Sequence, residues 1–359
     1  MMIFKPRFTI TPAITKALLE IERHKEAIEH LPFSASMLAS LRESARLIST
    51  HYSTQIEGNQ LSPKEVEKVV KKNIGGFPGR ERDEMEVKNY YKALEVVESL
   101  ASSNDPIKEK DIQCIHSLIL KGKTNPTPYR DGQNVIQDSM SGAVVYMPPE
   151  YTDVPQLMEE LVRWINQQVK EEILPVAIIG AIAHYQYATI HPYYDGNGRT
   201  ARLLTTLVLH KCGYDLKGIY SLEEYYAKNL KAYYNALDTD NIPNYYMGRK
   251  ETNITPFLEY FCSGMAISFR RIRTKAEQEK APDQSKILRQ LSARQKQALS
   301  LFNKQAEIKS SELASHLGIP DRSSAELCIK WVEDGFLKIT NPSKKARAYG
   351  LSDIYEKLI

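Results

Sequence analysis

The chain has 359 residues, enough for two or three domains, and 42% of them are hydrophobic, as in globular proteins with a filled core. This composition excludes a disordered chain, and the longest apolar run (residues 174–183) is about half of the ~20 residues that a membrane span needs. The net charge is only +4, but residues 284–359 carry 13 Lys and Arg against 8 Asp and Glu, which favours an anionic partner there.

Apolar residues recur every three to four positions through most of the chain, which predicts an all-α protein. The predicted helices span residues 12–30, 35–57, 62–70, 80–99, 108–120, 154–171, 177–190, 199–211, 222–237 and 254–277. Two short β-prone runs, residues 134–137 and 143–147, surround the letters SMSG and predict a small β-hairpin. Pro148 and Pro149 then prevent the second run from continuing as a strand.

The last part of the chain has a different organisation. A charged segment with one proline, residues 275–286, predicts a linker. Three helix-sized units and two β-prone runs follow, which predict a winged helix-turn-helix at residues 287–359. If this domain binds DNA, Lys344, Lys345 and Arg347 would contact phosphates. A winged helix that serves only protein contacts or dimer packing fits the pattern equally well.

The most unusual stretch, HPYYDGNGRTAR, joins two apolar helices at residues 191–202. Gly196 and Gly198 permit positive φ angles, so the turn can direct several backbone N–H groups into one concavity. Arg199 and Arg202 lie three residues apart at a helix N-terminus, where the helix dipole disfavours cations. We therefore predict a polyphosphate site, because guanidinium groups match phosphate oxygens in pairs.

Asp195 and His191 add two chemical functions to this site. Asp195 has the wrong charge for an anion site unless a divalent cation joins it to the phosphate, as Mg²⁺ commonly does. His191 has an ordinary pKa of about 6.5, which suits a general base. Each feature alone is usually structural, but their conjunction within twelve residues predicts phosphoryl or nucleotidyl transfer to a hydroxyl.

HPYYDGNGRTAR resembles the signature of the Fic family, HxFx(D/E)GNGRxxR, with Tyr193 in place of the usual Phe. The resemblance covers roughly residues 1–270 and implies the Fic fold, a helical bundle with a small β-hairpin. It implies N-terminal helices at residues 1–100 and a catalytic core at residues 101–274. The implied activity is that of a protein adenylyltransferase, which transfers AMP from ATP to a Tyr, Thr or Ser hydroxyl of a target protein.

The resemblance also implies individual roles. His191 removes the proton of the acceptor hydroxyl, and Asp195 holds Mg²⁺ against the α- and β-phosphates of ATP. The loop residues Gly196, Asn197 and Gly198 bind phosphates. Arg199 and Arg202 bind the β- and γ-phosphates. The nucleoside is contacted by Asn229, Tyr233 and Tyr234. For the last three, an aromatic core stripe is an equally good interpretation.

Two further elements of the resemblance concern specificity. The hairpin at residues 143–147 would align a target segment by strand addition. Gly198 favours AMP transfer, because the related Doc-type kinases carry Lys at that position and transfer the γ-phosphate.

An upstream stretch, STQIEGNQ, resembles the family's inhibitory motif (S/T)xxxE(G/N) of the N-terminal, class II type. Glu57 falls in the last turn of a predicted helix, where the dipole disfavours a carboxylate, and Ser53 shares its face. The resemblance implies that Glu57 pairs with Arg202 and blocks the ATP γ-phosphate. The same carboxylate could instead activate water and remove AMP from a target, and the sequence does not rank these two directions.

The sequence also allows other functions, and it suggests partners and a location for the protein. A nucleotide-sensing DNA-binding regulator, and transfer of UMP, GMP or phosphate, remain alternatives. We expect an unidentified target protein and a homodimer, and self-modification is a further option given 21 tyrosines. Four widely spaced cysteines without a CxxC pair and a start without a secretory pattern favour a cytoplasmic location and no structural zinc.

Overall fold

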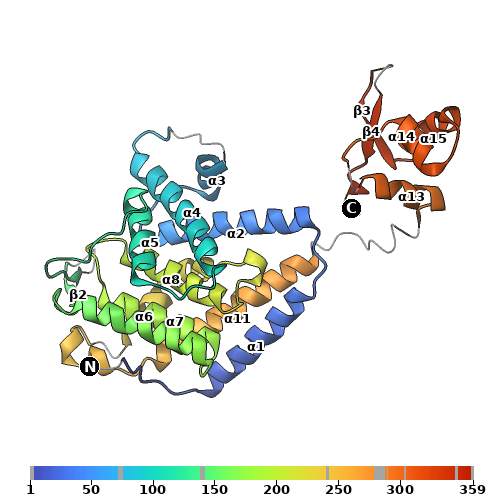
Figure 1. Cartoon of the computed structure of the whole chain (residues 1–359). Helices are drawn as coiled ribbons and strands as arrows, with labels where there is room; N and C mark the ends of the chain where they lie inside the picture. The colour runs from blue at the N-terminus through green and yellow to red at the C-terminus, as the bar shows by residue number, and fades with distance from the viewer. Residues whose placement is uncertain are drawn as a thin grey trace. The chain divides into compact units, whose positions relative to one another are not determined.

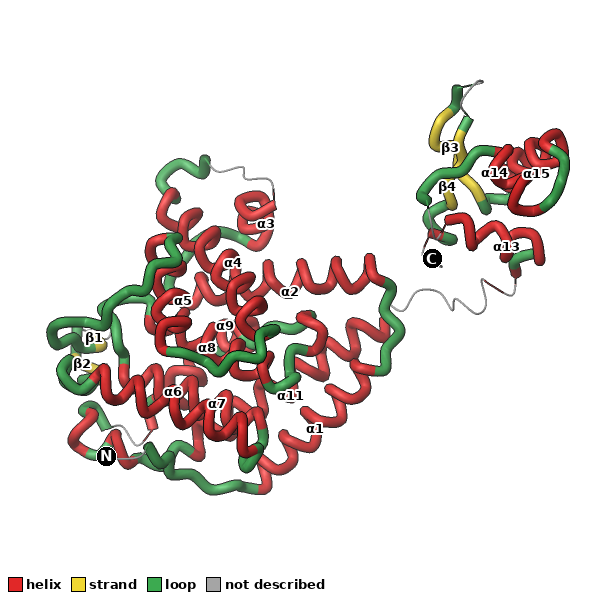
Figure 2. Tube along the Cα trace, viewed as in Figure 1, coloured by secondary structure: helices red, strands yellow, loops and turns green. Residues whose placement is uncertain are grey.

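Figure 1 shows the computed structural model, which describes residues 4–71, 76–137, 142–239, 242–278, 288, 290–302, 305–343 and 347–356. Within these ranges the chain is mostly helical, with two short two-stranded sheets (Figure 2), so the all-α prediction is confirmed. The chain divides into two compact units, one of Met1–Leu31 and Ala35–Ala276 and one of Pro32–Ser34 and Glu277–Ile359. Among the described helices, none combines the length and the apolar composition of a membrane-spanning segment.

The first unit contains most of the helices. In chain order its elements are α1 (Pro12–Glu29), α2 (Ala35–Ile56), α3 (Pro63–Lys71), α4 (Glu81–Ala101), α5 (Glu109–Lys121), β1 (Ile136–Gln137), β2 (Val144–Tyr146), α6 (Val154–Glu171), α7 (Val176–Ile190), α8 (Asn197–Lys211), η1 (Leu216–Gly218), α9 (Glu223–Lys228), α10 (Leu230–Leu237), η3 (Tyr245–Met247), η4 (Arg249–Glu251) and α11 (Thr255–Gln278).

Helix α7 is the most deeply buried element of this unit. All of its residues from Ala177 to Ile190 except Ala188 are buried, as expected for a helix that is apolar on every side. It packs against α6 and α8. Gly180 permits a close approach to α8, because a Cβ atom there would lie only 2.9 Å from Cδ2 of Leu209. The two helices that flank HPYYDGNGRTAR are therefore held in tight contact.

Local sequence signals set several helix ends. The hydroxyl of Thr11 accepts the N–H of Ile14 at the start of α1. Ser62 and Glu65 exchange capping hydrogen bonds at the start of α3. Helix α5 ends at Gly122, whose φ of 62° lies in the left-handed region that glycine favours.

The predicted helix at residues 222–237 is two helices, α9 and α10. The break is at Asn229, whose backbone leaves the helical region with φ −125° and ψ 40°. Its side-chain Nδ2 donates to the carbonyl oxygen of Tyr225 at 2.9 Å. Asparagine often disrupts helices in this way, because its side chain bonds to nearby backbone groups in non-helical conformations.

The predicted hairpin is present but shorter than expected. Strands β1 and β2 pair antiparallel, and most of SMSG lies outside the described residues. The hydroxyl of Tyr146 donates to the carbonyl oxygen of Thr189 at 2.9 Å, which fastens the hairpin to α7. Val144 and Val145 remain 48% and 40% exposed. The hairpin is thus anchored at its base and accessible along its strands.

In the second unit, helices and then an antiparallel pair of strands follow one another among the described residues. Its elements are α13 (Ala293–Phe302), α14 (Ser310–Leu317), α15 (Asp321–Glu333), β3 (Leu337–Asn341) and β4 (Ala348–Leu351). Trp331, Phe336 and Tyr349 are among the residues of a core of its own. Lys344 and Lys345 lie outside the described residues, whereas Arg347 is exposed. The winged-helix interpretation stays a prediction.

Candidate active site

HPYYDGNGRTAR forms the connection between α7 and α8. Helix α7 ends at Ile190 and is capped by His191, which has a left-handed φ of 51°, and Gly196 has a φ of 77° directly before α8 begins. The positive φ expected at Gly196 is therefore observed. Gly198 instead lies inside the first turn of α8 and is not among the residues with positive φ. Gly198 matters because it has no side chain that would occupy the space next to Glu57 and Arg202.

The loop is closed by side-chain bonds to its own backbone. The Asn197 amide donates to the carbonyl oxygen of Tyr193 at 2.7 Å and accepts the Tyr193 N–H at 3.0 Å. The side chain of Asn197 thus shapes the loop, which leaves the backbone N–H groups of the first helical turn as the groups that can meet an anion. Tyr193 itself is buried beneath the loop, 2% exposed.

His116 on α5 supports the loop from below and was not found by sequence reasoning. Its Nε2 donates to the carbonyl oxygen of Asp195 at 2.9 Å, and its ring stacks on Tyr193 with centroids 3.5 Å apart. Burial lowers the pKa of His116 to about 4, so the ring is neutral at neutral pH. A histidine on the apolar side of a predicted helix was the only signal in the sequence.

His191 is held in place by a bond to its backbone carbonyl oxygen. Arg130, 4% exposed, donates through Nε to the carbonyl oxygen of His191 at 3.1 Å and through Nη2 to that of Pro149, next to the hairpin. Sequence reasoning missed Arg130 as well. It ties the end of α7 to the segment that follows β2.

The protonation of the His191 ring suits a general base. Its Nδ1 lies 3.3 Å from the carbonyl oxygen of Ala188, which can only accept, so Nδ1 carries the proton and Nε2 keeps its lone pair. Burial lowers the pKa of His191 to about 4. The ring is therefore neutral at physiological pH.

Arg202 is the most enclosed cation of the site, with 1% of its surface exposed. Its Nη2 donates to Oε1 of Glu57 at 2.8 Å, and its Nε donates to Oγ of Ser53 at 2.8 Å. Nη2 also lies 3.0 Å from the carbonyl oxygen of Ser53. The structure thus brings the three residues predicted for the inhibitory contact together, although 145 residues separate Glu57 from Arg202 in sequence.

Gly198 explains how closely Glu57 approaches the loop. A Cβ atom at position 198 would lie 2.6 Å from Oε1 of Glu57 and 3.3 Å from Nη1 of Arg202. A side chain at this position would displace the Glu57 carboxylate from its present place. The carboxylate of Glu57 lies directly against the first turn of α8, where the anion site was predicted.

Arg199 points toward different acidic residues. Its Nη2 lies 3.2 Å from Oδ1 of Asp195, and its Nη1 lies 3.3 Å from Oε1 of Glu86 on α4. Arg199 is 2% exposed and its buried Nε has no hydrogen-bond partner in the described part of the chain. No motif or unusual charge placement in the sequence pointed to Glu86.

The residues predicted for the nucleoside lie in different environments. Tyr233 is buried and Tyr234 is 49% exposed. Asn229 is exposed at the break between α9 and α10. Charges of Glu57 and Arg202 both act on the pKa of Tyr234, which burial raises. Tyr234 therefore lies near the two charged groups with much of its ring accessible.

Tyr233 belongs to a hydrogen-bond chain with a defined direction. The Thr205 hydroxyl donates to the carbonyl oxygen of Ala201 at 2.8 Å, so its oxygen must accept Nδ1–H of His184 at 3.0 Å. Nε2 of His184 is then the acceptor for the hydroxyl of Tyr233 at 2.8 Å. Burial raises the pKa of Tyr233, and the nearby positive charge of Arg202 lowers it.

Asp195 is the residue that fits a metal ion. Its side chain is 60% exposed, and only its Oδ1 is paired with Arg199. No group of three or more His, Cys, Asp or Glu residues that could hold a metal was found in the described ranges. Mg²⁺ often binds through one carboxylate together with substrate phosphates, which is the arrangement that Asp195 permits.

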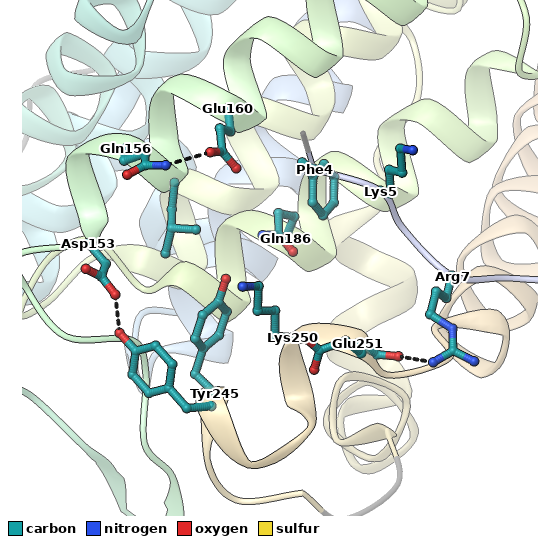
Figure 3. A pocket seen from close by; sticks show the side chains of 12 residues that line it. Phe4, Lys5, Arg7, Asp153, Gln156, Glu160, Gln186, Tyr245, Lys250 and Glu251 are labelled. Atoms are coloured by element: carbon teal, nitrogen blue, oxygen red, sulfur yellow. Dashed lines mark hydrogen bonds between the residues drawn. The ribbon is translucent and has the colours of Figure 1, made fainter. Parts of the chain in front are cut away.

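A cavity of about 360 Å³ lies elsewhere in the first unit (Figure 3). Its lining includes Gln186, on the helix that leads to His191, but none of the predicted site residues. Three acidic and three basic residues line it, so no excess charge selects a ligand: Asp153, Glu160, Glu251, Lys5, Arg7 and Lys250.

The helical bundle and this loop place the protein in the Fic fold. A Fic family protein from Desulfovibrio desulfuricans G20 has a TM-score of 0.64 at 24% identity, covering 98% of this chain and 99% of that chain. A Fic domain containing signaling protein from Bacteroides thetaiotaomicron VPI-5482 has a TM-score of 0.62 at 24% identity, covering 74% and 98%. At these identities the likeness establishes the fold, and the fold prediction is confirmed.

Residues 106–209 match the model of the Fic/DOC family. Protein adenylyltransferase fic-1 of Caenorhabditis elegans is 27% identical over 296 residues, 80% of this chain and 56% of the relative. Protein adenylyltransferase Fic of Drosophila persimilis is 27% identical over 200 residues, 55% and 38%. The chain thus spans about half or less of the length of these curated relatives.

Proposed function

We propose that this protein is an adenylyltransferase that moves AMP from ATP to a Tyr, Thr or Ser hydroxyl of a target protein and is inhibited by its own Glu57. One observation carries the proposal: Glu57, directly after the end of α2, lies 2.8 Å from Arg202 on α8, beside the loop that holds the neutral base His191. The names of the relatives from C. elegans and D. persimilis support the reaction class.

The reaction follows from the chemistry of the loop. Nε2 of His191 accepts the proton of the target hydroxyl, whose oxygen forms a bond to the α-phosphorus of ATP. The bond from that phosphorus to the β-phosphate oxygen breaks, and pyrophosphate leaves. Backbone N–H groups from Gly196 to Gly198 stabilise the charge that develops, and Arg199 and Arg202 bind the β- and γ-phosphates.

Mg²⁺ bound at Asp195 would neutralise phosphate charge and so favour departure of pyrophosphate. The nucleoside would meet Tyr234 and Asn229 at the accessible end of the site. Tyr233 would act less directly, because its hydroxyl is bonded to His184. Gly198 supports AMP transfer over phosphate transfer, since a lysine there would meet Glu57 and Arg202.

Inhibition follows from competition for Arg202. While Glu57 holds Nη2, a γ-phosphate cannot take that donor, and the carboxylate also repels phosphate oxygens. The exposed strand β2 supports alignment of a target segment by strand addition. The second unit would bind DNA or protein as a winged helix, and we propose a homodimer for the complete enzyme.

The reverse reaction is a second candidate, favoured by one feature of Glu57. Only Oε1 of its carboxylate is bonded, and Oε2 has no partner within the described ranges. A carboxylate with a free oxygen beside a phosphate site can activate water, which would release AMP from a modified target. Incubating an AMP-modified target with wild type and with Glu57→Ala separates the directions, because release requires the carboxylate.

Intact-mass analysis of Glu57→Gly after incubation with Mg²⁺ and ATP tests the main proposal. We expect addition of AMP to the chain or to an added candidate target, and its loss in a variant that also carries His191→Ala. Parallel incubations with UTP, GTP and γ-labelled ATP identify the transferred group. Glu57→Gly without any nucleotide transfer across candidate targets would refute the proposal.

A further inference from the structure

Arg199 is paired with a carboxylate that does not belong to the loop. Its Nη1 lies 3.3 Å from Oε1 of Glu86, and the side chains of the two residues are 2% and 13% exposed. Charges so shielded from water are weakly screened by salt. Glu86 therefore competes with any anion that approaches Arg199, as Glu57 does at Arg202.

Glu86 is in turn bound to the inhibitory segment. Asn59 is buried two residues after Glu57, and its Nδ2 lies 3.2 Å from Oε2 of Glu86 and 3.0 Å from the carbonyl oxygen of Asp83. The other side of the Asn59 amide accepts the N–H of Leu61 at 3.1 Å, which fixes its orientation. The segment from Glu57 to Asn59 therefore bonds to Arg202 directly and is linked to Arg199 through Glu86.

The present contacts do not satisfy Arg199 completely. Its Nη1 and Nη2 meet carboxylates, but its Nε is buried without a partner in the described residues. An unsatisfied buried donor is unfavourable. Phosphate groups commonly engage the guanidinium through paired donors, so a bound polyphosphate offers Arg199 a more complete set of acceptors.

We propose that Glu86 is a second acidic residue of the switch, which withholds Arg199 from nucleotide in the resting state while Asn59 holds Glu86 in place. The inference rests on the proposed function, because it takes nucleotide phosphates as the anion for which the acidic residues compete. Movement of the segment that carries Glu57 and Asn59 releases both arginines together. Glu86 acts through Arg199 and touches no reacting atom, so its role is one of positioning.

Titration calorimetry of the full chain with ATP and Mg²⁺ tests the proposal without requiring AMP transfer. Glu86→Gln keeps an oxygen that can accept from Arg199 but removes the charge. We expect it to bind ATP roughly threefold to tenfold more tightly than wild type. Glu95→Gln is the matched control, because Glu95 is exposed on the same helix and loses the same charge. We expect its affinity to equal that of wild type.

A double-mutant cycle tests the link through Asn59. Glu86→Gln should increase the affinity for ATP less in the Glu57→Gly background than in wild type, because the segment has already lost its bond to Arg202. Equal increases in the two backgrounds would overturn the link through Asn59. If Glu86→Gln does not fold, Glu86→Asp withdraws the carboxylate without removing its charge and should give a smaller gain. Unchanged or weaker ATP binding by the folded variant overturns the proposal. Absence of ATP binding by Glu57→Gly would instead overturn the proposed function.

Discussion

Replacing Glu57 by Gln separates two ways in which this residue inhibits. Its charge pairs with Arg202 at 2.8 Å, and its side chain also fills the space against Gly198, where a Cβ would lie 2.6 Å from Oε1. Glutamine has nearly the same shape as glutamate. Glu57→Gln therefore removes the charge and leaves the side chain in place, whereas Glu57→Gly removes both.

The size of each effect follows from the contact. A hydrogen bond between charged groups contributes about 1.5–3 kcal/mol, and one with a neutral partner about 0.5–1.5 kcal/mol. The charge alone is then worth about 1–1.5 kcal/mol, which makes Glu57→Gln roughly fivefold to tenfold more active than wild type at low ATP. Removing the whole contact makes Glu57→Gly roughly tenfold to 150-fold more active.

Initial rates of AMP transfer at ATP concentrations below KM measure these differences directly. We expect the order Glu57→Gly, then Glu57→Gln, then wild type. A glutamine variant no more active than wild type would refute the contribution of charge. A glutamine variant as active as Glu57→Gly would refute the contribution of occupied space. Loss of activity in Glu57→Gly on adding His191→Ala confirms that the same site is measured.

Three other predictions concern the base, the metal and the hydrogen bond between Tyr233 and His184. Burial lowers the pKa of His191 to about 4, so transfer by Glu57→Gly should stay constant from about pH 8 down to about pH 5.5, and a rate that halves near pH 6.5 would contradict this. Asp195→Asn in that background should raise the Mg²⁺ concentration needed for half-maximal transfer, whereas an unchanged Mg²⁺ titration excludes Asp195 as the ligand. Tyr233→Phe leaves Nε2 of His184 unsatisfied and should destabilise the first unit by about 1–3 kcal/mol, seen as a lower Tm by calorimetry, while the exposed Tyr234→Phe should leave the Tm unchanged.

The sequence predicted the parts of the site that are continuous along the chain. Periodicity located nearly all the helices of the first unit, and the glycines of HPYYDGNGRTAR indicated a loop with positive φ, as Gly196 shows. The unfavourable charges of Glu57 at one helix end and of Arg199 and Arg202 at another helix start invited a pairing, and the family resemblance implied Arg202 as the partner, which lies 2.8 Å from Glu57. Misplaced charges were informative because each departs from what its own helix prefers.

The supporting residues could not be predicted, because their importance depends on where distant helices cross. His116, Arg130 and Glu86 are ordinary residues in their own sequence contexts, and each acts through a contact with the loop from another element. Such contacts between distant elements have no local signature in the sequence. The break at Asn229 was missed for the opposite reason, since a purely local side-chain bond overrides a helical pattern on both sides.

The inhibitory contact also stabilises the fold, and this gives a final prediction. Arg202 is 1% exposed, so its charge requires a partner, and Glu57 is the only carboxylate within 4.0 Å of it among the described residues. Glu57→Gly should lower the Tm of the first unit by about 3–10 °C without nucleotide. ATP with Mg²⁺ should raise the Tm of Glu57→Gly more than that of wild type, because the phosphates supply the missing charge. Thermal unfolding with and without ATP measures both effects, with Glu95→Gln as the control for loss of one surface carboxylate. A Tm of Glu57→Gly at or above the wild-type value without ATP would show that Arg202 does not depend on Glu57, and that inhibition and stability are separate in this protein.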